Sequence, residues 1–391
     1  MDDHVLYTMP ASLYSAKARS YLRCQRIPFH ERVPGDPRYD SRIVPVVGRW
    51  ILPVLECPDG TLVQDTVDII DHLDAQVGPD RSAYPATPVH RVVAHVLELF
   101  GGEGLLRPAM HYRWNFDEDN LPFLSADFAS ALAPLGSDDA TRAMVFDFAS
   151  GRMRAATTSF GVTPETVPTI EESYAEFLER FDAHLAVSPY LLGGRPTLGD
   201  FAFMGPLHAH LARDPHPSLV MKQRAPRVWR WVERMQSADG DVGEYGDLED
   251  GLFPDDAVPP TLAALLAYIA GEDLDEIADQ VRAVDAWLAD HPDVAEGEVV
   301  GGKPSHRSLG TTTFRWRDHD LTVGVIPYRM VLLQRLRDAH DGLDDAGRAA
   351  ARAALGTAGL DPLLELRPRR RVERRDNREV WGAEEEPVLL G

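Results

Sequence analysis

The chain has 391 residues, which is enough for two or three domains of about 100–200 residues each. Its 40 basic and 62 acidic residues give a formal net charge of −22, and such a negative field repels nucleic acids and anionic membrane surfaces. We therefore expect neither a nucleic-acid partner nor a membrane partner, and no apolar run approaches the roughly 20 residues that span a bilayer.

The cysteine content and the first residues point to a reducing compartment. Cys24 and Cys57 are the two cysteines, too few for a disulfide framework or a four-ligand zinc site, so we expect no metal. The acidic start MDDHVLY lacks the features of a secretory signal. These features predict a cytoplasmic protein.

The first 80 residues alternate between strand and helix patterns. HVLYTM and IPFHERVP are typical of strands, and SLYSAKARSYLRCQ between them has helical apolar spacing. Two further short strands, 51–55 and 61–63, are joined by Pro58-Asp59-Gly60, a hairpin signal, and DTVDIIDHLD follows as an amphipathic helix. The order predicts an α/β unit with a mixed sheet over residues 1–80.

The next 150 or so residues show helical spacing throughout. Five segments between 88 and 240 repeat apolar residues every three or four positions and are separated by Gly- and Pro-rich breaks. They predict an all-α helical bundle. An acidic connector follows between Ala238 and Pro260.

The remaining chain has no motif that we can assign to a function. Residues 256–360 predict a mostly helical extension, with a helix pair near 260–291, a Gly-rich strand-like segment and helices near 327–356. The tail, 366–391, has seven arginines between Arg367 and Arg378 and then an acidic run. We expect this tail to be solvated and partly disordered.

Four segments in the first two units carry a resemblance to a known family. In chain order they are YTMPASLYSAKAR, RWILPVLE, LVQDTVDIIDHLD and YLLGGRPTLGDFAFMGPL. Their order and spacing resemble a glutathione S-transferase of the serine-type classes, over roughly residues 4–237. The resemblance implies a thioredoxin-like glutathione-binding domain, a helical C-terminal domain with Thr197 and Asp200 as a structural capping pair, and a homodimer.

The resemblance places Ser12 where the family has its catalytic serine, at the head of the first helix. A free thiol has a pKa near ~8.5, so a hydroxyl donor at a helix N-terminus would favour the nucleophilic thiolate. Serine is also a preferred helix cap, which is the alternative role. Tyr7, which ends the first strand as the catalytic tyrosine of other classes does, and Ser15 are neighbouring candidates.

Other positions match the family's glutathione-binding residues. Leu52 precedes Pro53, the family's cis proline, so its backbone would pair with the cysteinyl part of the tripeptide; a trans proline at a strand edge is the alternative. Asp65 and Thr66 fall at the start of the third helix, which suits the γ-glutamyl end, although both also form caps. Arg49, or the Trp next to it, could meet the glycyl carboxylate.

The resemblance also implies a second-substrate pocket between the two domains. The candidate residues are Met9, Pro10, Met110, His111, Tyr112 and Trp114. Met110 and Trp114 are also spaced as two core residues of one helix face would be, which is the alternative.

The function implied is that of a glutathione transferase-like enzyme. A glutathione thiolate would attack a small hydrophobic or aromatic electrophile, in conjugation, thioether cleavage, dehalogenation or isomerisation, and glutathione would be the cosubstrate. Two alternatives remain open: a non-catalytic binding or regulatory protein on the same scaffold, or an enzyme that uses a different low-molecular-weight thiol.

Overall fold

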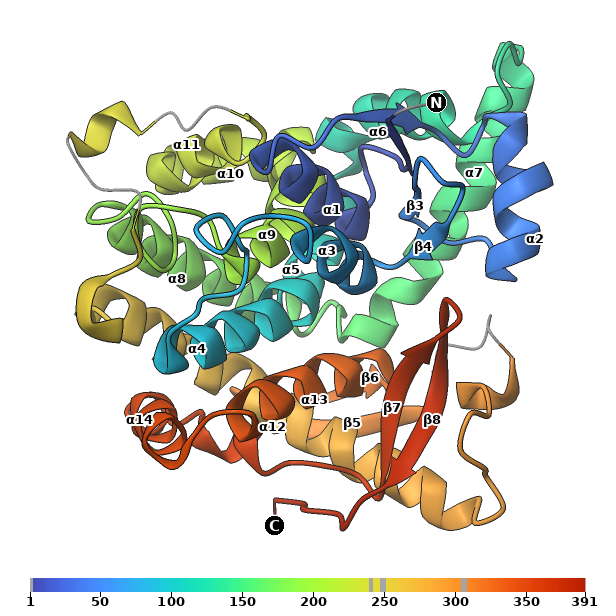
Figure 1. The fold of residues 1–391 in the computed structure, drawn as a ribbon. Coiled ribbons are helices and arrows are strands. Elements are labelled where there is room, and N and C mark those ends of the chain that lie inside the picture. Colours follow the sequence, from blue (N-terminus) through green and yellow to red (C-terminus); the bar gives the residue numbers. More distant parts are fainter. Residues whose placement is uncertain (1–2, 239–241, 247–250, 304–307, 391) are drawn as a thin grey trace.

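The computed structural model describes residues 3–238, 242–246, 251–303 and 308–390, so parts of the predicted connector and of the strand-like segment lie outside the described residues. Figure 1 shows three parts: an N-terminal α/β domain, a helical bundle beside it, and an extension below both. The first two match the expected fold class. The thioredoxin-like unit and the bundle occupy the first 234 residues.

The N-terminal domain is built on a small mixed sheet. Its elements are β1 (His4–Tyr7), α1 (Leu13–Cys24), β2 (Phe29–Arg32), α2 (Val44–Val47), β3 (Val54–Glu56), β4 (Leu62–Gln64) and α3 (Thr66–Asp74). The strand order is β2-β1-β3-β4, with β1 parallel to β2 and antiparallel to β3. Along β1, Val5 and Tyr7 face one apolar cluster and Leu6 faces another, so both sides of the sheet are covered.

The bundle follows from residue 88. Its helices are α4 (Pro88–Leu99), α5 (Leu106–Trp114), α6 (Asp117–Leu132), α7 (Asp139–Ala156), α8 (Val167–Leu185), α9 (Leu198–Pro206), α10 (Pro215–Arg224) and α11 (Pro226–Arg234). The capping box predicted at the start of α9 is present: Thr197 donates its N–H to Asp200 Oδ2 over 2.9 Å. Asp200 also accepts the N–H of Leu191 at 3.0 Å, which ties the preceding loop to the helix.

The extension is more regular than the sequence indicated. Its elements are α12 (Pro260–Asp290), β5 (Thr311–Trp316), β6 (His319–Gly324), α13 (Tyr328–Asp341), α14 (Asp345–Gly356), β7 (Arg370–Arg375) and β8 (Arg378–Glu384). The helix pair predicted near 260–291 is a single helix of 31 residues. Gly271 inside it does not end the helix, because its neighbours continue the apolar spacing.

The prediction of a partly disordered tail is wrong, because β7 and β8 pair as an antiparallel hairpin. Asp376 and Asn377 make the turn, both with positive φ (50° and 63°), which suits a tight hairpin. Val372 and Trp381 bury their side chains beneath it. Arg369, Arg371 and Arg374 of the basic run pair with Asp285, Asp338 and Glu379, so this run is not a solvated tail.

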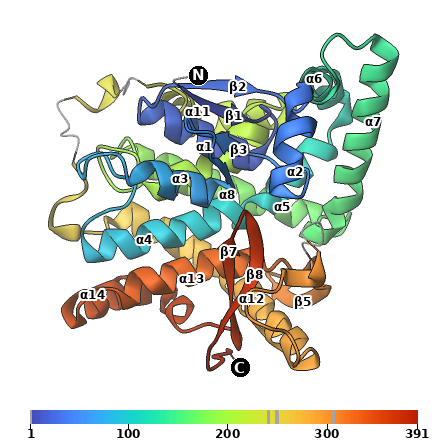
Figure 2. The same ribbon diagram turned by 45° about the vertical axis from the view of Figure 1, so that its right-hand side comes forward.

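The extension shares its core with the other two parts. One apolar cluster joins residues of α1, α4, α8, α12 and α13; examples are Leu22, Leu97, Phe177, Leu266 and Leu333. Helices α13 and α14 both lie against α4, as Figure 2 shows. The three parts therefore pack as one body.

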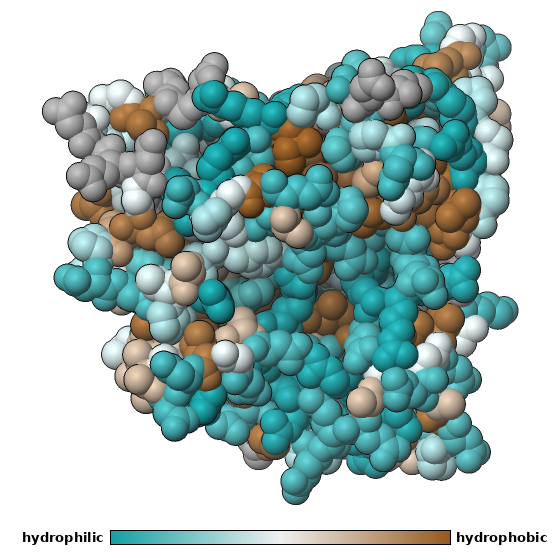
Figure 3. Space-filling view, viewed as in Figure 1, coloured by the Kyte–Doolittle hydropathy of each residue, from teal (hydrophilic) through white to brown (hydrophobic). Residues whose placement is uncertain are grey.

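The surface seen in Figure 3 is mostly hydrophilic, with hydrophobic side chains in several small groups. The exposed large apolar residues include Phe148 of α7, at 69% exposure, and Val46 of α2, at 56%. Among the described residues, no helix combines the length and the apolar character needed to cross a membrane.

Candidate functional site

The strand register brings three candidate segments to one end of the sheet. Tyr7 faces Val54 across the antiparallel pair β1–β3, so the turn after β1 runs beside Leu52 and Pro53. The N–H of Asp65 lies 3.5 Å from the carbonyl oxygen of Pro53, which puts the start of α3 next to the same turn. The peptide bond between Leu52 and Pro53 is cis, the isomer that the resemblance implies.

Ser12 is the N-cap of α1. Its backbone is extended (φ −85°, ψ 121°), and its Oγ accepts the N–H of Ser15 over 3.3 Å. A capping hydroxyl uses a lone pair as acceptor, so its proton is still available to donate. The side chain is half-buried at the positive end of a 12-residue helix. Capping and a role toward an anionic sulfur are therefore compatible.

The two neighbouring candidates have different surroundings. The hydroxyl of Tyr7 donates to Glu56 Oε2 over 3.2 Å, and burial together with this carboxylate raises the pKa of the phenol. Because Glu56 faces Val5 in the sheet, this contact directs the phenol back along β1 and away from the turn that carries Ser12. Ser15 is buried, and its Oγ has no hydrogen-bond partner within the part of the chain that the structure describes.

The turn that carries Ser12 is held by a buried arginine of α5. Arg113 donates to the carbonyl of Ala11 at 2.9 Å and to the carbonyl of Ala209 at 2.6 Å, and it pairs with buried Asp214 at 2.7 and 2.9 Å. These bonds tie the start of α1 to the helical bundle. The position of Ser12 thus depends on both domains.

The backbone of Leu52 is open to a ligand. Neither its N–H nor its C=O makes a hydrogen bond to other described residues, although the side chain is buried. An extended peptide can pair with such a backbone as an added strand. This inner part of the site lies beside the Met9–Ser12 turn.

The outer part of the site is contacted by the extension, which the sequence did not indicate. Arg49 donates to Glu379 of β8 at 2.7 and 3.1 Å. Asp65 caps α3 by accepting the N–H of Val67 at 3.0 Å, and the same oxygen accepts the hydroxyl of Tyr328 at 2.7 Å. Thr66 is buried at the first position of α3. The only sequence signal for these contacts is the Asp-Asn pair between β7 and β8, a turn-forming dipeptide.

The residues expected to line a second-substrate pocket separate into two groups. Met9, Met110 and Trp114 are buried in the apolar cluster that also contains Tyr7 and Leu52, and Pro10 is half-buried beside them. Met110 and Trp114 are therefore as buried as two core residues of one helix face would be, which was the alternative to a pocket.

His111 and Tyr112 point elsewhere. His111 Nε2 lies 3.0 Å from Glu171 Oε1, and burial lowers the pKa of this histidine. Tyr112 stacks on Phe116 with ring centroids 5.5 Å apart. It lines a cavity of about 190 Å³ between α5, α8 and α10, together with Glu171 and Arg224. Of the six expected residues, Tyr112 lines this cavity.

Two family models match this chain. Residues 6–81 match the N-terminal domain of glutathione S-transferases, and residues 164–234 match their C-terminal domain. The two matches follow one another along the chain in the order N-terminal domain, then C-terminal domain. The extension lies outside both matches.

Solved structures of glutathione S-transferases are similar to part of the chain. One from Sinorhizobium meliloti 1021 is 16% identical, over 68% of this chain and 92% of that chain, with a TM-score of 0.32. One from Methylobacterium radiotolerans in complex with glutathione sulfonate is 20% identical, over 66% and 100%, with a TM-score of 0.35. The beta-etherase LigF from Sphingobium sp. strain SYK-6 is 17% identical, over 63% and 98%, with a TM-score of 0.41. No curated protein matches the sequence.

Proposed function

We propose that the protein is a glutathione transferase-like enzyme that holds a glutathione thiolate at the head of α1. The observation that carries the proposal is the position of Ser12. Its hydroxyl caps α1 beside the open backbone of Leu52, in a domain of the glutathione S-transferase type. The backbone of Leu52 would pair with the cysteinyl unit, which brings its sulfur to the serine hydroxyl.

The chemistry required of Ser12 is modest. Lowering a thiol pKa from about 8.5 by about 2 units takes roughly 2.7 kcal/mol of preferential stabilisation of the anion. A hydrogen bond to a charged group contributes about 1.5–3 kcal/mol, and a helix N-terminus adds about 0.3–1 kcal/mol. The two effects together are of the required size. Neither Tyr7, whose pKa is raised, nor a metal is needed in this scheme.

In the proposed reaction the thiol first loses its proton to solvent. The sulfur then forms a bond to an electrophilic carbon. In a substitution, the bond to the leaving group breaks and its electron pair departs with that group. The apolar side chains of Met9 and Met110 beside the site favour a hydrophobic or aromatic electrophile. Conjugation, thioether cleavage, dehalogenation and isomerisation share this first step.

The test is the substitution Ser12→Ala, with Ser15→Ala as the matched variant on the same helix. Steady-state kinetics with glutathione and an aromatic electrophile should show kcat/KM reduced by about 10²-fold or more for Ser12→Ala and its pH profile moved to higher pH. If both variants lost kcat/KM equally, thiolate stabilisation would be assigned to Ser15 or to the helix as a whole. An unchanged Ser12→Ala enzyme would contradict the proposal.

A second candidate function is an enzyme of the same type with a different low-molecular-weight thiol. It is favoured because Arg49 and Asp65, which the resemblance matches to the two ends of glutathione, already bond to Glu379 and Tyr328 of the extension. Thermal unfolding with glutathione, cysteine and coenzyme A distinguishes the two, because a ligand at 100 times its Kd adds about 2.7 kcal/mol of stability. The thiol that raises the melting temperature is the cosubstrate.

We also propose that the protein is a cytoplasmic homodimer, as the family resemblance implies. Light scattering coupled to size-exclusion chromatography measures the mass directly. A value of twice the 43.4 kDa chain supports the dimer, and a monomer mass contradicts it.

A further inference from the structure

The extension reaches the site through the end of the β7–β8 hairpin, residues 374–379, which we call the hairpin tip. In Figure 1 the hairpin rises from the extension toward the N-terminal domain, and the turned view agrees. Glu379 pairs with Arg49 through both carboxylate oxygens, at 2.7 and 3.1 Å. The arginine is 7% exposed and the glutamate 9%, so the pair is shielded from water.

The other side of the hairpin tip contacts the junction between β4 and α3. The N–H of Gln64 donates to Asn377 Oδ1 at 2.9 Å. Arg374 donates to the carbonyl oxygen of Gln64 at 2.7 Å and to Asp68 at 2.8 Å. It also bridges back to Glu379 at 2.9 Å, which joins the two sides of the hairpin tip into one polar unit.

A residue of α13 completes these contacts. The hydroxyl of Tyr328 donates to Asp65 Oδ1 at 2.7 Å, and the tyrosine is 3% exposed. Arg49 and Asp65, which the family resemblance matches to the two ends of glutathione, thus both bond to groups of the extension.

The groups presented by the hairpin tip have the chemistry of the tripeptide ends. Glu379 places a carboxylate on Arg49, where a glycyl carboxylate would bind. Arg374 places a cation beside the Asp65–Asp68 helix start, where a γ-glutamyl ammonium would bind. Asn377 places an amide carbonyl on the N–H of Gln64, as a peptide bond would. The hairpin tip therefore satisfies the same polar groups as the proposed ligand.

This inference rests on the proposed function. We propose that the hairpin tip occupies the outer part of the candidate site, around Arg49 and Asp65, in the absence of glutathione. Glutathione binds in competition with it, because its two ends need the groups that the hairpin tip holds. A thiol that lacks both ends reaches Ser12 and Leu52 without displacing the hairpin tip. The hairpin thus determines which thiols the site accepts.

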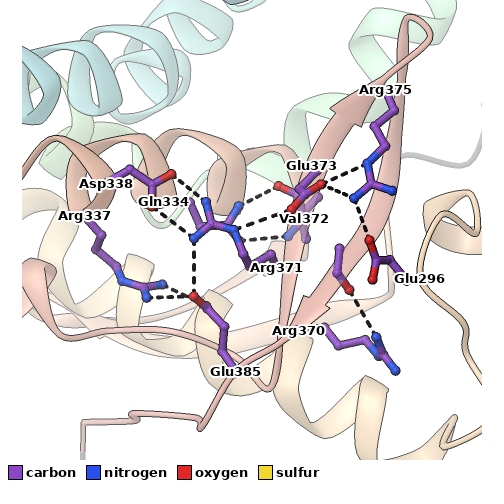
Figure 4. Close-up of polar contacts among 11 residues, drawn as sticks. Glu296, Gln334, Arg337, Asp338, Arg370, Arg371, Val372, Glu373, Arg375 and Glu385 are labelled. Atoms are coloured by element: carbon purple, nitrogen blue, oxygen red, sulfur yellow. Dashed lines mark hydrogen bonds and ion pairs between the residues drawn. The ribbon is translucent and has the colours of Figure 1, made fainter. Parts of the chain in front are cut away.

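The base of the hairpin is fixed separately, so the hairpin tip can move without unfolding the extension. Figure 4 shows the base: Val372 exchanges two hydrogen bonds with Gln334 of α13, at 2.6 and 2.8 Å, and Arg371 pairs with Asp338 at 2.6 Å. Trp381 stacks on Trp287 of α12, with ring centroids 5.3 Å apart. The partners named here all belong to the extension. The polar contacts of the hairpin tip are therefore the ones that glutathione replaces.

The matched variants are Glu379→Gln and Glu384→Gln in the full chain. Both change one β8 glutamate that pairs with arginine, but Glu384 contacts Arg370 at the base, outside the site. Calorimetric titration with glutathione should give an affinity at least about tenfold tighter for Glu379→Gln than for the wild type, since Arg49 then lacks a competing carboxylate. Glu384→Gln should match the wild type. Arg374→Gln, with Arg370→Gln as its control, serves if Glu379→Gln does not fold.

Hydrogen exchange gives a second measurement on the wild type. Added glutathione should increase exchange in peptides that cover 374–379 while the base around Val372 stays protected, whereas cysteine should leave the hairpin tip unchanged. If wild type and Glu379→Gln bind glutathione equally well while kcat/KM still depends on Ser12, the proposed competition between glutathione and the hairpin tip is wrong. The proposed function then stands. Absence of glutathione binding in every variant overturns both.

Discussion

Glu379 of β8 holds Arg49, 330 residues earlier in the chain, through two hydrogen bonds of 2.7 and 3.1 Å. Gln64 Oε1 accepts a third bond from the same guanidinium at 3.1 Å. Removing one partner of a buried ion pair leaves an uncompensated charge, which costs several kcal/mol. The last strand of the extension is thereby coupled energetically to the site in the first domain.

The hairpin should be a structural part of the protein. Trp381 is 1% exposed in the core that the three parts share, whereas Trp50 is 52% exposed. We expect Trp381→Ala to lower the free energy of unfolding by about 3–5 kcal/mol and Trp50→Ala by less than about 0.5 kcal/mol. Chemical denaturation of both variants measures the difference. Equal stabilities would mean that the hairpin does not contribute to the core.

Arg113 should position Ser12. Arg113→Lys keeps a positive charge beside Asp214 but cannot reproduce the bonds to both Ala11 and Ala209. We expect a loss of about 1–3 kcal/mol in stability and, at temperatures where the variant is folded, a lower kcat with an alkaline shift of its pH profile.

Arg213→Lys is the control for this position, because Arg213 pairs with Asp127 at 2.6 Å and does not contact the turn. A change in stability without any change in the pH profile would show that Arg113 is structural and does not position the serine.

Acid should destabilise the protein through His184. Its ring is fully buried between the hydroxyl of Thr261, at 3.0 Å, and the carbonyl of Tyr190, at 3.2 Å, and burial lowers its pKa to about 4. In the unfolded chain this pKa is about 6.5, so the unfolded state takes up the proton first and stability falls as the pH drops from 6.5 toward 4. The contribution lost by about pH 4.5 is about 2–3 kcal/mol.

Urea unfolding at neutral and acid pH, with wild type and His184→Gln, measures this effect. The glutamine amide can still donate to Tyr190 but does not titrate, so the acid-induced loss should be smaller in the variant. Identical pH dependence in the two proteins would exclude His184 as the source.

The two cysteines should not react in the folded protein. Burial raises the pKa of Cys24 to about 12 and also raises the pKa of Cys57, so neither thiol forms a thiolate at neutral pH. A thiol reagent such as dithionitrobenzoate should therefore modify both only after denaturation. Rapid modification of the native chain would contradict this and would also complicate any assay that follows glutathione consumption.

The sequence predicted the parts of the fold that depend on local patterns. The alternation of strands and helices in the first 80 residues, the hairpin at Pro58–Gly60 and the capping pair Thr197–Asp200 all rest on residues close in sequence, and the structure contains them. The cap at Ser12 was foreseeable for the same reason.

The partners of Arg49 and Asp65 could not be predicted in this way. Their contacts, Glu379 and Tyr328, are separated from them by 330 and 263 residues. The arginine run around Arg374 has the composition of a solvated tail, but it pairs with β8 as a strand and its arginines bond to carboxylates elsewhere in the chain. Composition reports charge but does not report which distant group neutralises it.

The ionisation of bound glutathione tests the central claim most directly. Ultraviolet difference spectra record the thiolate as the pH is raised, with the protein saturated by glutathione at each point. The account predicts a thiol pKa about 2 units below the free value of about 8.5 in the wild type and a return toward the free value in Ser12→Ala. A bound thiol that titrates like free glutathione in both proteins would contradict it.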